Sequence, residues 1–125
     1  MFRGKRLDNG EWVTGNLFVS DTDSRTHILI GSRIFTIEWE VDPSTIGQYT
    51  GLTDKNGKRI FDGDVAKVLQ GKDKDIAYVG FENGAFMLYP KTGNIYERTL
   101  WEYWYNDWDV EVIGNITDNP ELLEK

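Results

Sequence analysis

Asp62 and Asp64, two carboxylates separated by one glycine, have the clearest capacity for chemistry in the chain. Such a pair can divide the roles of general acid and general base, or can hold Mg²⁺. Alternate residues of a strand share a face, but the intervening Gly63 indicates a turn instead. Asx-type hydrogen bonds to nearby amides would then account for both side chains. We therefore prefer a structural turn here and keep hydrolysis by this pair as a minor alternative.

Two other patterns could bind metal. Asp54-x-Asn56-Gly57 is similar to the start of a calcium loop, but it lacks the spacing and the glutamate at position twelve of an EF-hand. His27 is the single histidine and there is no cysteine, so a zinc site would need carboxylates for its other protein ligands. We expect a hairpin turn at Asn56-Gly57, a surface or strand-end histidine, and neither metal nor cofactor.

The densest apolar feature is a C-terminal aromatic segment. Four of its aromatic residues follow the i, i+3, i+4, i+7 spacing of one helix face, although a strand would instead group the first, third and fifth. Thr99 and Glu102 fit a capping box at its start, so a helix is preferred. The segment comprises Trp101, Tyr103, Trp104, Tyr105 and Trp108.

Two interpretations of this segment stay open. One helix face can pack into the core. Five aromatic residues are hard to bury in so small a protein, however, and exposed Trp and Tyr often mark protein interfaces, so the segment is also the candidate protein-interaction surface. Stacking on nucleic acid is disfavoured because Glu102, Asp107 and Asp109 interleave with the rings and would repel phosphate.

The charge is uneven. The chain carries 14 basic and 21 acidic residues, and the residues from Leu100 onward contribute seven acids against Lys125 alone. A phosphate backbone requires clustered Lys and Arg, so we expect no nucleic-acid partner. A solvated surface is the simplest interpretation of the acidic end, with mimicry of nucleic acid as an alternative.

Length and composition limit the architecture. A chain of 125 residues fits a single domain, 1–125, with a real core. No apolar run approaches the ~18 residues of a membrane span, and the first residues are polar without the apolar region of a signal peptide. These features lead us to expect a cytoplasmic protein with no membrane partner.

The segments that must position these residues are predicted to be short strands separated by tight turns. Asn-Gly occurs three times and favours type I′ hairpin turns. Asn9-Gly10 joins strands 3–7 and 12–19, Asn83-Gly84 joins 77–82 and 85–89, and Asn56-Gly57 supplies the third turn. Gly31-Ser32 is expected to turn 27–30 onto 34–38. Further strands are predicted at 65–69 and 110–116, a helical turn after Asn119-Pro120, and mobile loops at 21–26 and 71–75.

One turn-rich block, residues 46–68, gives the chain its most specific signature. Its residues 46–65 read Ile-Gly-Gln-Tyr-Thr-Gly-Leu-Thr-Asp-Lys-Asn-Gly-Lys-Arg-Ile-Phe-Asp-Gly-Asp-Val. These residues resemble the YopX family, as do Val79–Phe86, Glu111–Leu123 and the opening Phe2–Lys5. The loop 20–26 and the aromatic segment lie outside the similarity. The residues that form the family-signature turns are Gly47, Gly51, Asn56, Gly57, Asp62, Gly63 and Asp64.

The resemblance implies an all-β, barrel-like fold of short antiparallel strands and an origin in a bacteriophage or prophage. It implies no activity, cofactor or catalytic residue. The chain is thus expected to be a phage accessory protein without enzymatic activity, a protein-binding module that forms homo-oligomers or binds a host or phage protein. The alternative is an acidic mimic that inhibits a host nucleic-acid-binding protein.

Overall fold

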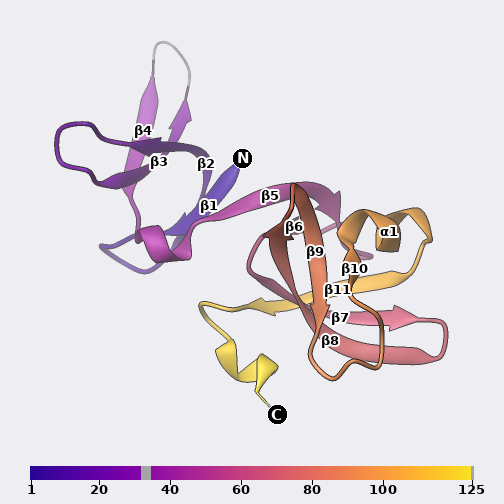
Figure 1. Ribbon diagram of the computed structural model, residues 1–125. Helices are drawn as coiled ribbons and strands as arrows, with labels where there is room; N and C mark the ends of the chain where they lie inside the picture. Colours follow the sequence, from indigo (N-terminus) through magenta and orange to yellow (C-terminus); the bar gives the residue numbers. More distant parts are fainter. Residues whose placement is uncertain (32–34, 125) are drawn as a thin grey trace. The chain divides into compact units, whose positions relative to one another are not determined.

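Tight turns between short strands organise the chain (Figure 1). The computed structural model describes residues 1–31 and 35–124. The chain divides into two compact units, Met1–Tyr49 and Thr50–Lys125, which are described in turn. The prediction of a single domain over 1–125 stays a prediction.

The first unit is an antiparallel sheet in the order β4-β3-β2-β1-β5. The predicted Asn9-Gly10 hairpin is confirmed, because β1 pairs with β2 and Gly10 adopts a φ of 72°. Its turn is not the predicted type I′, because Asn9 lacks the positive φ that this type requires at both central residues. β3 also pairs with β4 as predicted, whereas Ser32 and Ile34 of that hairpin lie outside the described residues. The elements of the first unit are β1 (Phe2–Lys5), β2 (Trp12–Val19), β3 (Thr26–Gly31), β4 (Thr36–Glu40), the 3₁₀ turn η1 (Pro43–Thr45) and the start of β5 (Gly47–Thr53).

The second unit contains the remainder of β5, which pairs with β6, and a five-stranded antiparallel sheet in the order β10-β9-β8-β7-β11. The Asn83-Gly84 hairpin is confirmed, with Glu82 opposite Ala85. The elements of the second unit, after the end of β5, are β6 (Arg59–Phe61), β7 (Asp64–Gln70), β8 (Asp73–Glu82), β9 (Ala85–Pro90), β10 (Arg98–Thr99), α1 (Leu100–Tyr105), β11 (Asp109–Asn115) and the 3₁₀ helix η2 (Pro120–Leu123).

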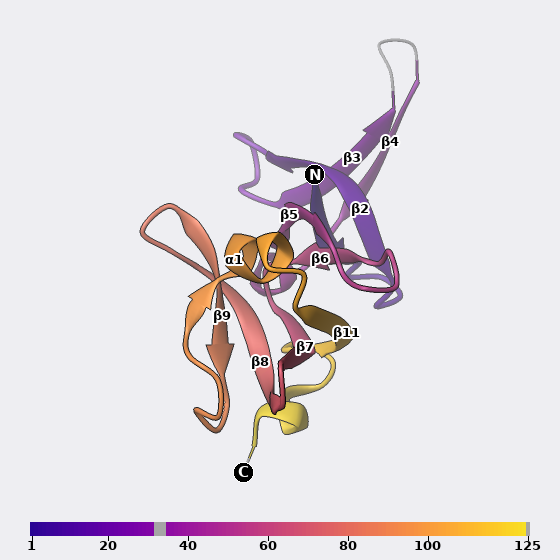
Figure 2. The same ribbon diagram turned by 90° about the vertical axis from the view of Figure 1, so that its right-hand side faces the viewer.

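The core of the second unit forms on one face of this sheet, where alternate strand residues point the same way. Ala66 and Val68 of β7 are fully buried, as are Ala77 of β8 and Leu88 of β9. Helix α1 contacts β9 and β10 (Figure 2) and adds two side chains to the same cluster, Leu100 and Tyr103.

The prediction of a mainly β fold with a short C-terminal helix is confirmed. A closed barrel is not observed, because each sheet ends in an edge strand on both sides among the described strands. None of the helices in the described ranges is long and apolar enough to cross a membrane.

Two local predictions, those for the aromatic helix and for the loop 71–75, need correction. Helix α1 ends at Tyr105, before Trp108. The helical turn predicted after Asn119-Pro120 is confirmed as η2, with Asn119 at its N-cap position; the Asn119 Oδ1 makes no capping bond and accepts instead from the Asn115 amide at 3.2 Å. The predicted mobile loop 71–75 is a tight turn leading into β8, and Asp75 is buried.

Candidate functional site

The block 46–68 consists of β5, β6 and the start of β7, joined by turns at Asn56-Gly57 and Asp62-Gly63. Gly51, Gly57 and Gly63 have φ values of 87°, 80° and 92°, a left-handed conformation that glycine adopts without steric cost. Gly47 is instead a buried residue of β5, opposite Arg3 of β1. The turn positions of the block therefore have a structural use.

Asp54 fixes the Asn56-Gly57 turn and ties it to the last strand. Its Oδ1 accepts from the Asn56 and Lys58 amides, each at 2.9 Å, and its Oδ2 accepts from the Val112 amide at 2.9 Å. Burial opposes ionisation of this carboxyl, but the hydrogen bonds from Val112, Lys58 and Asn56 outweigh it and hold the pKa of Asp54 below its ordinary value. With both oxygens used by amides, this carboxylate is a structural anchor.

The Asp62-Gly63-Asp64 turn likewise holds the chain together. Asp64 is 1% exposed, and its Oδ2 accepts from the Phe61 amide at 2.8 Å. The backbone of Gly63 bonds to Val79 and Ile116, at 2.9 and 2.8 Å. Because Asp64 is enclosed, it could not reach a substrate, and the hydrolase alternative loses one of its two carboxylates.

His27 lies on β3 with its Nδ1 2.8 Å from Glu38 Oε1 of β4. Its side chain is 13% exposed and lies against the Phe18 ring. Within residues 1–31 and 35–124, no cluster of three or more His, Asp or Glu side chains could hold a metal ion.

Helix α1 exposes most of the aromatic segment. Trp101, Trp104 and Tyr105 are 56%, 57% and 67% exposed, and the rings of Trp101 and Tyr105 stack at 4.9 Å. The predicted capping box starts the helix, since Thr99 Oγ1 accepts from the Glu102 amide at 3.2 Å. These three rings are the part of the candidate surface that the structure places in solvent.

Tyr103 does not belong to that surface. It is fully buried beside Leu100, because residues three apart share the helix face that meets the sheet. Its ring meets Trp108 edge-on at 5.1 Å, and Trp108 is partly buried. Burial raises the pKa of the Tyr103 hydroxyl, which has no hydrogen-bond partner among the described side chains and backbone.

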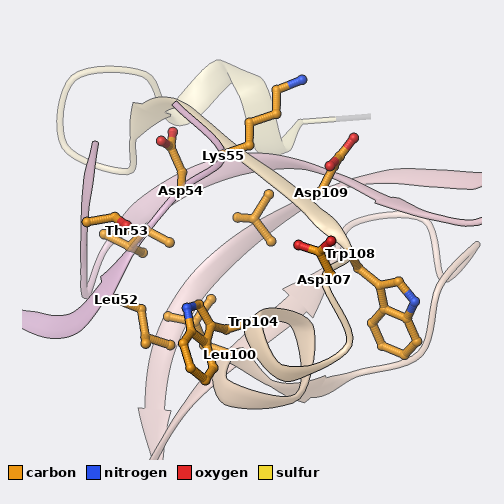
Figure 3. Close-up of a pocket in the computed structure, with 11 residues that line it drawn as sticks. Leu52, Thr53, Asp54, Lys55, Leu100, Trp104, Asp107, Trp108 and Asp109 are labelled. Atoms are coloured by element: carbon orange, nitrogen blue, oxygen red, sulfur yellow. The ribbon is translucent and has the colours of Figure 1, made fainter. Parts of the chain in front are cut away.

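Two hollows flank α1. One, of about 400 Å³, is lined by Leu52, Phe86 and Trp101 among others. The other, of about 210 Å³, is called the Trp104 hollow here (Figure 3). Its lining consists of Leu52, Thr53, Asp54, Lys55, Ile60, Leu100, Trp104, Asp107, Trp108, Asp109 and Val110.

The acids near α1 differ in their partners. Glu102 forms an ion pair with Arg98 at 3.1 Å, and Glu111 with Lys55 at 3.6 Å. The Arg98 hydrogen bond lowers the pKa of Glu102, although burial partly opposes it. The side chains of Asp107 and Asp109 form no hydrogen bond or ion pair with any described residue. The negative charge left uncompensated around α1 is therefore theirs.

A comparison with protein-family models decides the family. The model described as YopX protein matches residues 1–124. The chain belongs to the YopX family. Among solved structures, protein EF1440 from Enterococcus faecalis is similar to it, with 26% identity, a TM-score of 0.59, and coverage of 98% of this chain and 96% of that one. A comparison with curated proteins gives no match.

Part of the apolar surface of this YopX-family chain was not predicted from the sequence. Phe81 and Phe86 face each other across the β8–β9 hairpin with ring centroids 5.0 Å apart, and Phe81 is 57% exposed. Their pairing could have been found: a two-residue Asn83-Gly84 turn places the residues two positions before and after it opposite one another.

Proposed function

We propose that this chain is a protein-binding module without enzymatic activity, and that the surface of α1 is where another protein docks. One observation carries the proposal: Trp101, Trp104 and Tyr105 are each more than half exposed on a single short helix beside two hollows. Large rings bury much area at little cost in side-chain entropy, which is why Trp and Tyr dominate binding hot spots.

The candidate chemistry supports a binding role over a catalytic one. Asp54 and Asp64 are enclosed and engaged by backbone amides. His27 is the single histidine of the chain and lies beside Glu38. A binding role in a bacteriophage or prophage setting is part of the same proposal.

A second copy of the chain is the first partner to test. Sedimentation velocity over a range of concentrations should show a reversible larger species for the natural chain. Trp101→Ser with Tyr105→Ser should weaken that association by about 2 kcal/mol or more, as hot-spot aromatic residues do. Phe35→Ser is the matched control, because Phe35 is 66% exposed and lies in the first unit.

A monomer at every concentration would refute self-association. Crosslinking capture from a bacterial host would then test the wider proposal. Loss of a captured protein with the Trp101/Tyr105 double variant, and its retention with Phe35→Ser, would support it. Equal capture by both variants would refute a role for α1.

The acidic surface supports a second candidate, a mimic that occupies a host protein's nucleic-acid site. Of the acids in residues 102–111, Glu102 and Glu111 have cationic partners, so the effective charge is smaller than the sequence count. Replacing Glu102, Asp107, Asp109 and Glu111 by their amides should abolish binding of such a host protein. Unchanged binding would refute the mimic.

A further inference from the structure

The Trp104 hollow combines apolar walls with charged edges. Leu52, Ile60 and Leu100 line it beside the Trp104 ring. At about 210 Å³ it is smaller than the ~300–1,000 Å³ of pockets for small-molecule ligands. Its size therefore suits one inserted side chain of a partner protein.

The charge at its edge is negative and available. Asp107 and Asp109 line the hollow without a partner among the described residues, whereas Asp54 is occupied by three amides. Figure 3 shows the Asp107 carboxylate directed toward the middle of the hollow. Lys55 is the one cation among the described residues that line the hollow, and Glu111 Oε2 lies 3.6 Å from its Nζ.

An aromatic face next to carboxylates is attractive to a cation with an apolar stem. The ring quadrupole draws a guanidinium or ammonium group, and the carboxylate adds a charge-assisted hydrogen bond. The methylene groups of Arg or Lys can meanwhile cover apolar walls. We infer that the Trp104 hollow receives an Arg or Lys side chain from an exposed segment of the partner protein, an inference that rests on the proposed docking role of α1.

This charge pattern also restricts how two copies could associate. A symmetric dimer places the same patch of each subunit against the other. Joining two Trp104 hollows would bring Asp107 and Asp109 of both copies together, and like charges facing each other disfavour an interface. A second copy could use the hollow only by inserting a basic residue from elsewhere on its surface.

Two synthetic peptides test the inference directly. One carries arginine between leucines, and the other carries citrulline, which has nearly the same shape without the charge. Binding is followed by the NMR signal of the Trp104 indole N–H, assigned by its loss in Trp104→Phe. The arginine peptide should shift this signal, and the citrulline peptide should bind at least about fivefold more weakly.

Substitutions of Asp107 test whether its negative charge, and not only an intact fold, is needed for binding of the arginine peptide. Asp107 has a φ of 56°, a conformation that asparagine and glycine also adopt, so Asp107→Asn and Asp107→Gly should both fold. Each should weaken arginine-peptide binding at least about threefold. Asp73→Asn removes an exposed carboxylate that does not line the hollow and should leave binding unchanged.

Equal binding of the two peptides would overturn the cation inference and leave an apolar docking surface in place. If the arginine peptide at millimolar concentration does not shift the Trp104 indole N–H signal, the inference is also overturned. The docking role of α1 is tested separately, by the association and capture experiments with the Trp101/Tyr105 double variant. Equal losses with Asp107→Asn and Asp73→Asn would show nonspecific charge attraction and refute the site.

Discussion

Replacing Asp54 by alanine should remove the connection between the β5–β6 turn and β11. Three amides, those of Asn56, Lys58 and Val112, lose an acceptor at 2.9 Å each. The amides of Asn56 and Lys58 belong to exposed residues and can bind water, but Val112 is buried. A buried amide left unpaired costs about 1–3 kcal/mol, and each of the two bonds to water-accessible amides adds about 0.5 kcal/mol, so we expect a loss of about 2–4 kcal/mol in the free energy of unfolding.

The same change should depend on pH. The pKa of Asp54 is lower in the folded chain than its ordinary value, so its contribution is fully present above the unfolded pKa of about 3.9. That contribution is lost as the pH falls through the folded pKa. The difference between the natural chain and Asp54→Ala should therefore be largest near neutral pH and shrink in acid.

Urea unfolding, followed by tryptophan fluorescence at neutral and acid pH, measures both effects. Hydrogen exchange at the Val112 amide reports the local connection, and should speed up in Asp54→Ala. Asp73→Ala is the control, an exposed aspartate at the start of β8. A stability change below about 0.5 kcal/mol, the usual size for surface substitutions, would refute the reasoning, as would a loss that persists undiminished in acid.

Three other substitutions test separate contacts. Tyr103→Phe removes a buried hydroxyl that has no described partner, so unfolding by urea should show an unchanged or up to ~1 kcal/mol greater stability; a loss would reveal a bond to the hydroxyl. Thr99→Ala removes the cap of α1 and should cost about 1 kcal/mol, seen as faster amide exchange at Glu102; unaltered exchange would contradict the capping role. Asp75→Asn weakens the hydrogen bonds that Asp75 accepts from the Thr92 and Asn94 amides, at 3.2 and 3.1 Å, and should lower the free energy of unfolding in urea by about 1–3 kcal/mol. Because the pKa of Asp75 is lowered in the folded chain, this loss should shrink in acid, and equal losses at neutral and acid pH would contradict the expectation.

Features set by neighbouring residues could be predicted from the sequence. Asn9-Gly10, Asn56-Gly57 and Asn83-Gly84 each lie in turns, because glycine adopts the positive φ that all three turns use. Only Asn83-Gly84 has positive φ at both residues, as the predicted type I′ turn requires. The capping box at Thr99 depends only on a residue three positions later. The YopX signature identified the family through the same kind of local pattern.

Features set by distant contacts could not be predicted in this way. The aromatic spacing defined a helix face, but Tyr103 rather than Trp104 is buried because the sheet meets the side of α1 that carries Leu100. Asp75 lies in a polar stretch of sequence, and its burial depends on Thr92 and Asn94 on a later loop. The same holds for Asp54, whose partner Val112 is 58 residues away.

The pairing of β11 with β7 has a consequence for synthesis. β11 is the last of the described strands along the chain, yet it pairs with β7, which leaves the ribosome well before it. Until residues 109–115 emerge, β7 is an edge strand with unpaired amides, and the Asp54 carboxylate lacks the Val112 amide. The second unit should therefore complete its fold only after residues 109–115 have emerged, and a chain that stops before β11 should be prone to aggregation and proteolysis.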